Sequence, residues 1–378
     1  MIVLTFGVLL IILNVLTSRK YNLLFSMMII FLIMGFQDNC QNDFLSYQED
    51  YRLAMQYGYL QDYSEHDSEP LWKFLMINSS KIIPWWMFVF SLACFECVVL
   101  YKFLKKFCKG KFAWIATILY YFTWNMMGMH MSLMRQGFVV AVMLAAFLSY
   151  EKTKKWKWPV IISVIAYLMH NSSVVMIPLL MGYIFLDKRK TKNPELAKKK
   201  EQIYFFPLIV TGGYLFLYLI KQVFLKSYLP ALALMFGDVN RLSGYLDATG
   251  QNHGMAHVDD LEVSMLIILY DAIIVFIVSY FYKYADLRMK WMYLLTIAAA
   301  FGDMMLFGIG SLPRIILYYC VFNIIVYPDI AQKIRSKWGL IPALAFVAML
   351  IGYAVKTSFP WMTGDDWGGI GTYQFVFF

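Results

Sequence analysis

Four polar positions beside or within apolar runs have side chains that could do chemistry. Glu69 ends an acidic stretch, Arg135 begins an apolar run, His170 interrupts another, and Arg314 precedes a third. Guanidinium groups bind anions, and imidazole and carboxylate groups exchange protons. The order of the apolar runs places all four near the same face of a membrane. Ionisable groups gathered at one depth of a membrane protein suggest a functional site.

Each of these residues also has a simpler interpretation. An arginine at the end of a membrane span often extends its side chain to the interface, which applies to Arg135 and Arg314 taken singly. A lone histidine at a membrane turn is often a satisfied interfacial residue, and Glu69 stands among several acids that are solvated. Asp303, in the middle of an apolar run, is expected to pair with an Arg or Tyr of another span, with a proton relay as the alternative.

Composition and charge define the elements that would position these residues. The chain is 61% hydrophobic with a mean hydropathy of +0.59, which is typical of an integral membrane protein. We predict an all-α fold with about 12 transmembrane helices, built from apolar runs that are long enough to cross or to dip into a bilayer. These runs are 2–17, 21–36, 82–101, 112–129, 134–150, 158–169, 171–186, 203–220, 263–281, 291–309, 315–330 and 338–355.

The distribution of the 33 lysines and arginines predicts the orientation. If the lysine-rich loop after residue 101 is cytoplasmic, alternation places most of the cations inside and both termini outside. This asymmetry follows the positive-inside rule and accounts for the net charge of +9 without a nucleic-acid partner. We predict one polytopic domain over 1–378, with external loops 37–81 and 221–262 and a basic cytoplasmic loop 187–202.

The apolar run from Trp158 to Leu186 is too short to cross a bilayer twice. Lysine-rich segments flank both ends, so the run should leave and re-enter the cytoplasmic face. Two complete crossings need roughly 40 residues, which is more than this run provides. We therefore predict a short hairpin that either turns inside the bilayer or thins it, with His170, Asn171, Ser172 and Ser173 at its middle.

At these residues the chain resembles the EpsG family of Wzy-type polysaccharide polymerases. The resemblance runs in order along nearly the whole chain, and Gln37 and Gln41–Asp43 stand where that family usually has an arginine before a Gly-x-Asp motif. The segments that carry it are Asp43–Tyr47, Ser68–Leu71, Leu133–Gly137, Met169–Ser173, Arg241–Tyr245 and Arg314–Tyr318.

The resemblance implies a membrane glycosyltransferase with a GT-C-like architecture. Such a polymerase passes a growing chain from undecaprenyl diphosphate to a sugar hydroxyl of the next lipid-linked repeat unit, on the outer leaflet of the bacterial plasma membrane. It makes exopolysaccharide, capsule or O-antigen. No metal-ligand spacing is visible, so we predict transfer without metal or cofactor. A flippase and a chain-length regulator are the implied partners.

The implied roles can be assigned residue by residue. Preorganised arginines would stabilise charge on the leaving diphosphate, and a base would remove or share the acceptor proton. The predicted diphosphate ligands are Arg135, Arg314 and Arg241; the candidate bases are His170, Glu69 and Asp43; the supporting residues are Gln136, Tyr318, Tyr245 and Tyr47.

Two other functions share features of this sequence. A flippase or transporter of lipid-linked oligosaccharide would favour inverted repeats and a site at the midplane, whereas no repeat is visible and the polar residues gather on one side. A membrane O-acyltransferase with His170 as base would share the single active face. Acyl transfer rather than glycosyl transfer would distinguish that enzyme.

Overall fold

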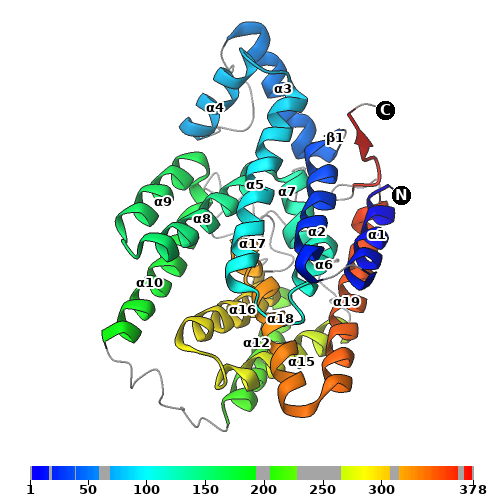
Figure 1. The fold of residues 1–378 in the computed structure, drawn as a ribbon, viewed down its shortest axis with the longest axis vertical. Helices are drawn as coiled ribbons and strands as arrows, with labels where there is room; N and C mark the ends of the chain where they lie inside the picture. The colour runs from blue at the N-terminus through cyan, green and yellow to red at the C-terminus, as the bar shows by residue number, and fades with distance from the viewer. Residues whose placement is uncertain are drawn as a thin grey trace. The chain divides into compact units, whose positions relative to one another are not determined.

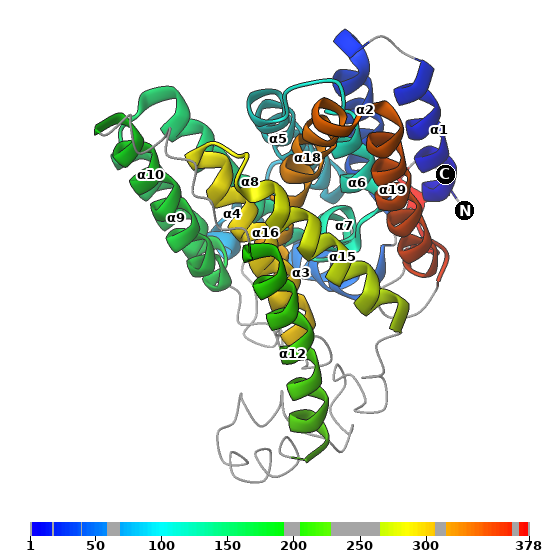
Figure 2. The same ribbon diagram turned by 90° about the horizontal axis from the view of Figure 1, so that it is seen from below.

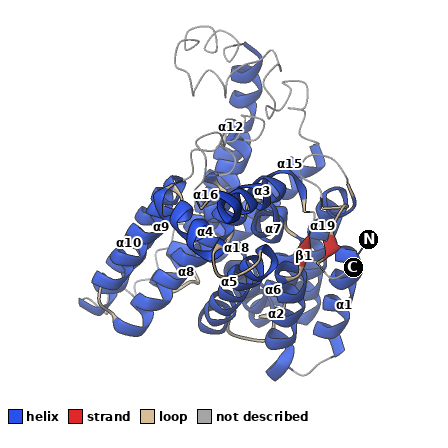
Figure 3. Cartoon of the chain, turned by 90° about the horizontal axis from the view of Figure 1, so that it is seen from above, coloured by secondary structure: helices blue, strands red, loops and turns tan. Residues whose placement is uncertain are grey.

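The computed structural model describes residues 2–16, 19–38, 40–58, 69–192, 205–227, 265–306, 315–364 and 370–376. The predicted site residues Arg241, Tyr245 and Arg314 lie outside the described residues. The described chain is almost entirely helical (Figures 1 and 3). It divides into two compact units, Met1–Ile184 with Tyr327–Phe378 and Phe185–Val326.

The first unit carries most of the helices and the one short strand pair seen in the described residues. Strands β1 (Gln37–Asp38) and β2 (Gln374–Phe375) are antiparallel, so the end of the chain pairs with the segment after α2. The helices are α1 (Ile2–Leu16), α2 (Arg19–Gly35), α3 (Gln41–Tyr57), α4 (Pro70–Ser80), α5 (Trp85–Phe107), α6 (Ile115–Phe122), η1 (Trp124–Gly128), α7 (Met129–Ser132), α8 (Met134–Thr153), α9 (Lys157–Met169), η2 (Asn171–Val175) and α19 (Leu340–Thr363). Helices α10 (Met176–Lys192) and α18 (Asn323–Trp338) each continue from one unit into the other.

The second unit is a smaller helical group. It contains α12 (Phe206–Ser227), α15 (Met265–Tyr282), α16 (Leu287–Leu306) and α17 (Leu317–Cys320), and α12, α15 and α16 pack on one another (Figure 2). The buried side chains of Tyr214, Val275 and Met304 form its core.

Polar groups in this core are paired across helices. Tyr214 donates a hydrogen bond to Asp271 (3.3 Å), and Lys221 Nζ donates to the backbone oxygen of Met304 (2.6 Å). The charges of Lys221 and Asp303 also interact. Among the described residues, the charged group that interacts with Asp303 is therefore a lysine, and its expected pairing with an Arg or Tyr remains a prediction.

Helix length and hydropathy support a membrane protein. Three described helices, α5, α15 and α19, are long and apolar enough to cross a bilayer. A fourth span is possible if the pair Trp124–Ser132 and Met134–Thr153, which is bent by 119°, counts as one. Several other apolar helices are shorter, among them α9 at Lys157–Met169. The total of about 12 spans and the GT-C-like architecture remain predictions.

The apolar run is broken into two helical segments at His170, whereas its turn within a bilayer remains a prediction. Helix α9 ends at Met169, and His170 is extended with φ −161° and ψ 117°. A 3-10 turn over Asn171–Val175 then leads into α10. Since α9 has only 13 residues, it rises about 20 Å, which is less than a full bilayer core.

The segment predicted as the first external loop contains two helices that its acids and polar residues obscured. In α3, Phe44, Tyr47 and Tyr51 are buried. Their spacing of three and four residues places them on one helical face. Helix α4 begins at Pro70, whose fixed φ suits the first helical position.

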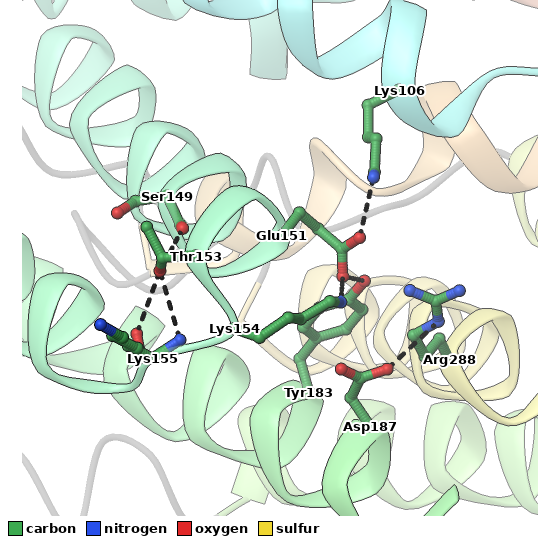
Figure 4. A network of polar contacts seen from close by, with 9 residues as sticks. All are labelled: Lys106, Ser149, Glu151, Thr153, Lys154, Lys155, Tyr183, Asp187 and Arg288. Atoms are coloured by element: carbon green, nitrogen blue, oxygen red, sulfur yellow. Dashed lines mark hydrogen bonds and ion pairs between the residues drawn. The ribbon is translucent and has the colours of Figure 1, made fainter. Parts of the chain in front are cut away.

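A buried carboxylate joins three helices near the lysine-rich end of α8 (Figure 4). Glu151 accepts hydrogen bonds from Tyr183 of α10 (2.8 Å) and Lys154 (2.8 Å), and it pairs with Lys106 of α5 (3.0 Å). Tyr183 is fully buried, so its hydrogen bond to Glu151 compensates for the loss of water at its hydroxyl. The cluster holds the ends of α5 and α8 against the middle of α10.

Replacing Glu151 by alanine should therefore destabilise the protein by about 1–3 kcal/mol, because the hydroxyl of Tyr183 loses its acceptor. Unfolding in detergent measures the change. The matched control is Glu49→Ala, which removes the partner of Arg52 from an ion pair whose side chains are 58% and 54% exposed. Exposed pairs contribute about 0–1 kcal/mol. Equal losses in the two variants would contradict the assigned role of Glu151.

Candidate active site

The carboxylate of Glu69 joins three of the segments singled out in the sequence. Its Oε1 accepts hydrogen bonds from His170 Nδ1 (2.9 Å) and from the backbone N–H of Asn171 (2.9 Å). Its Oε2 forms an ion pair with Arg135 Nη1 (2.7 Å). The side chains of Glu69, Arg135 and His170 are 8%, 13% and 19% exposed. The three groups thus form one compact, mostly buried cluster, called here the Glu69 cluster.

The backbone at Glu69 directs its side chain away from its own helix. Glu69 is extended (φ −60°, ψ 151°), and its carbonyl accepts the first helical hydrogen bond of α4 from Lys73. Its side chain makes no capping bond to α4. Instead it accepts from Asn171 at the start of η2, where the amide has no partner within its own helix. Glu69, which precedes α4, therefore caps the start of η2.

The break between α9 and η2 gives His170 its position. The amide of His170 still donates to Ala166, while its carbonyl accepts from Ser173. The residue thus belongs to both helical segments, and its extended backbone turns the imidazole toward Glu69. Helices α4 and α9 also pack on each other, which brings these residues together.

Arg135 lies in the first turn of α8, immediately after the 119° bend. Its guanidinium carbon lies 6.0 Å from the centre of the Tyr47 ring, a distance that permits a cation–π contact. The Tyr47 ring in turn packs edge-on against Trp72 at 5.8 Å. Arg135 Nε is buried and has no hydrogen-bond partner among the described residues. This donor is available to an anionic ligand, because guanidinium groups bind phosphate oxygens through several N–H groups.

The electrostatics of the cluster assign different roles to the acid and the histidine. Burial by itself raises the pKa of Glu69, but the hydrogen bonds from His170 and Asn171 and the charge of Arg135 outweigh it and lower the pKa to about 2. Glu69 is therefore ionised at neutral pH and is a weak base. An ionised carboxylate only accepts hydrogen bonds, so His170 Nδ1 carries the proton. Whenever the ring carries a single proton, on Nδ1, its Nε2 atom can accept a proton from another group.

The other predicted site residues have different outcomes. Gln136, the residue after Arg135, is buried. Asp43 is partly buried and lies one helical turn before Tyr47 on α3. Tyr318 is fully buried in α17 of the second unit. Since Arg241, Tyr245 and Arg314 lie outside the described residues, the multiple-arginine diphosphate site remains a prediction.

Two members of this environment were not predicted from the sequence. Trp72 supports Tyr47 beneath Arg135, and the amide of Asn171 holds Glu69. Trp72 follows Glu69 by three residues in a segment that begins with proline, so recognising α4 in advance would have indicated it. The role of the Asn171 amide could not be predicted, because every residue except proline has a backbone N–H donor.

Within the described ranges, no group of three or more His, Cys, Asp or Glu side chains is arranged to hold a metal ion. Transfer without metal or cofactor remains a prediction.

Comparison with known protein families identifies the family of this chain. The sequence profile of the EpsG family matches residues 20–369, which is most of the chain. The chain therefore belongs to the EpsG family, a family of Wzy-type polysaccharide polymerase-like membrane proteins. No curated protein and no solved structure matches it.

The low pKa of Glu69 predicts how the cluster contributes to stability as pH changes. Replacing Glu69 by glutamine should cost about 3 kcal/mol at neutral pH, because the buried charge of Arg135 loses its partner. The pKa falls from an ordinary value of 4.5 to about 2 in the folded protein. The excess stability of the wild type should therefore be constant above about pH 5 and should diminish as pH falls from about 4.5 to about 2.

Unfolding of both proteins in detergent over this pH range measures the difference. A difference that stayed constant down to about pH 3, or that grew as pH fell, would contradict an ionised Glu69 held by His170 and Arg135.

Proposed function

We propose that this EpsG-family protein is a polymerase that joins lipid-linked oligosaccharide repeat units by glycosyl transfer. The carrier would be undecaprenyl diphosphate, and the reaction would occur on the outer leaflet of the bacterial plasma membrane. The Glu69 cluster carries this proposal. It combines an oriented imidazole with a buried guanidinium whose Nε has no hydrogen-bond partner in the described ranges. Family membership supplies the class of reaction.

The proposed reaction needs one proton transfer and one displacement. His170 Nε2 accepts the proton of the acceptor sugar hydroxyl as that oxygen attacks the anomeric carbon of the donor. A new glycosidic bond forms, the bond between the anomeric carbon and the phosphate oxygen breaks, and the carrier diphosphate leaves with the electron pair. Holding the two lipid-linked substrates in one orientation supplies a large part of the rate enhancement.

Arg135 is suited to stabilise the departing diphosphate. Its Nη1 is held by Glu69, whereas its Nε can donate to a phosphate oxygen. A fixed donor in a poorly hydrated site costs little reorganisation when negative charge develops. Arg314 and Arg241 are proposed as further diphosphate ligands, in keeping with their places in the family resemblance.

Glu69 is better suited to orient His170 than to act as the base. A carboxylate with a pKa of about 2 has little affinity for a hydroxyl proton. Its hydrogen bond to Nδ1 fixes the tautomer of His170 and stabilises the imidazolium that forms when Nε2 takes the proton. Asp43 remains the alternative base, on the helix that presents Tyr47.

The aromatic residues beneath Arg135 support the site. Trp72 is fully buried and Tyr47 is 7% exposed, so neither presents a ring face to a sugar. Their packing instead restricts the guanidinium of Arg135, which lowers the entropy lost when a phosphate binds.

Alanine at Arg135 or His170 should lower polymer formation sharply. Loss of one preorganised donor typically costs about 10²–10³ in rate, and loss of a general base about 10²–10⁴. The reconstituted protein is supplied with its lipid-linked repeat unit, and the glycan products are measured by mass spectrometry. Single repeat units should accumulate in both variants.

Arg52→Ala is the matched control, because that arginine is exposed and paired with Glu49 on α3. It should retain polymer formation. Full-length polymer from the Arg135 and His170 variants would contradict the proposed roles. Translocation of the lipid-linked unit without any new glycosidic bond would indicate a flippase instead.

A further inference from the structure

We propose that Glu96 and His130 form a positioning pair that sets the direction of Arg135, so that its guanidinium reaches Glu69 and the departing diphosphate. Neither residue belongs to the Glu69 cluster. The effect of this pair on catalysis rests on the proposed function. The effect of the pair on the position of Arg135 can be tested without any activity. The argument follows from the bend that precedes α8.

The pair is a buried contact between two helices of the first unit. His130 Nδ1 of α7 makes a hydrogen bond with Glu96 Oε2 of α5, and the two side chains are 5% and 4% exposed. The Tyr120 ring lies 5.7 Å from the imidazole and closes the site further. A carboxylate buried inside an apolar helix is costly unless a hydrogen-bonding partner compensates it. His130 is therefore strongly held at Glu96, and α7 is held with it.

The packing at Gly137 transmits this restraint to α8. A Cβ atom at Gly137 would lie 2.7 Å from His130 Cα and 2.9 Å from its Cγ. Any side chain at this position would therefore push α7 and its histidine away. The direct contact between α7 and the first turn of α8 is possible because residue 137 is glycine.

Arg135 lies between the two ends of this contact. The chain turns at Leu133 (φ −92°, ψ 53°), and the helical segments on either side are bent by 119°. His130 is fixed before the turn, and Gly137 packs against His130 after the turn. The backbone of the residues between them therefore has little conformational freedom. The direction of the Arg135 side chain therefore depends on the position of His130.

A second contact connects the same region of α5 to α8. Phe95, next to Glu96, packs on Phe138 at 5.0 Å, and Phe138 also lies 6.5 Å from Trp72. Arg135 and Phe138 are three residues apart and share a face of α8. A displacement at Glu96 would thus reach Arg135 through Phe138 as well as through the bend.

A merely structural pair and a positioning pair differ in a measurable way. Loss of a structural contact would lower stability and leave the folded site intact. Loss of a positioning contact would release Arg135 from Glu69 in molecules that remain folded. The accessibility of the Arg135 guanidinium separates the two, and it does not depend on any activity.

The test is the rate at which phenylglyoxal modifies Arg135, followed by peptide mass spectrometry of the full chain in detergent. Gly137→Ala should raise that rate several-fold, while Arg52, whose side chain is 58% exposed, should react as before. The matched control is Gly352→Ala in α19, because a Cβ at Gly352 meets nothing within 4 Å. It should leave the rate at Arg135 unchanged.

Glu96→Leu provides a second variant, which removes the hydrogen-bond partner of His130 Nδ1 and should give the same increase. An unchanged rate at Arg135 in both variants would overturn the proposal, as would an equal increase in Gly352→Ala.

Activity then separates this inference from the proposed function. If both hold, Gly137→Ala lowers polymer formation in the wild-type background at least tenfold, and it causes no further loss in Arg135→Ala. A further loss in that background would overturn the proposed route through Arg135. If Arg135→Ala retains full polymer formation while Gly137→Ala still exposes Arg135, the positioning stands and the proposed function fails.

Discussion

A single ionised carboxylate holds together segments of this protein that are far apart in sequence. Glu69 and His170 are separated by 101 residues, and Arg135 lies between them on a third segment. Each contact depends on the others, because a buried carboxylate is stable only when its oxygens accept hydrogen bonds or face a cation. The interaction that aligns α4, α8 and the hairpin is thus the same one that orients the imidazole and the guanidinium. Stability and the proposed chemistry have a common origin.

The same physical solution recurs elsewhere among the described residues. Glu96 meets His130, Glu151 meets Lys106, and Lys221 donates to the carbonyl of Met304, in each case between different helices. In an apolar environment helices gain little from burying further hydrocarbon, so polar pairs and close backbone approaches specify which helices meet. Gly137 supplies such an approach beside the Glu96 pair. The Glu69 cluster differs from these pairs because Arg135 retains a buried donor that has no partner in the part of the chain that the structure describes.

Much of this arrangement was accessible from the sequence, for identifiable reasons. The short apolar run between two lysine clusters predicted the hairpin, and the structure breaks it at His170. Helix α3 was hidden because its buried aromatic residues alternate with acids and amides. The partners of Glu69 could not be predicted individually, since side-chain contacts depend on packing between distant helices. The roles assigned to Arg135, His170 and Glu69 remain predictions, and Arg314 and Arg241 lie outside the described residues.

The most direct test of the central claim is an experimental structure of the protein bound to undecaprenyl diphosphate. The account predicts a phosphate oxygen about 3 Å from Arg135 Nε, with Glu69 still joined to His170 Nδ1 and His170 Nε2 facing the space beside the diphosphate. A diphosphate bound away from Arg135, or a Glu69 carboxylate that contacts neither His170 nor Arg135, would contradict it.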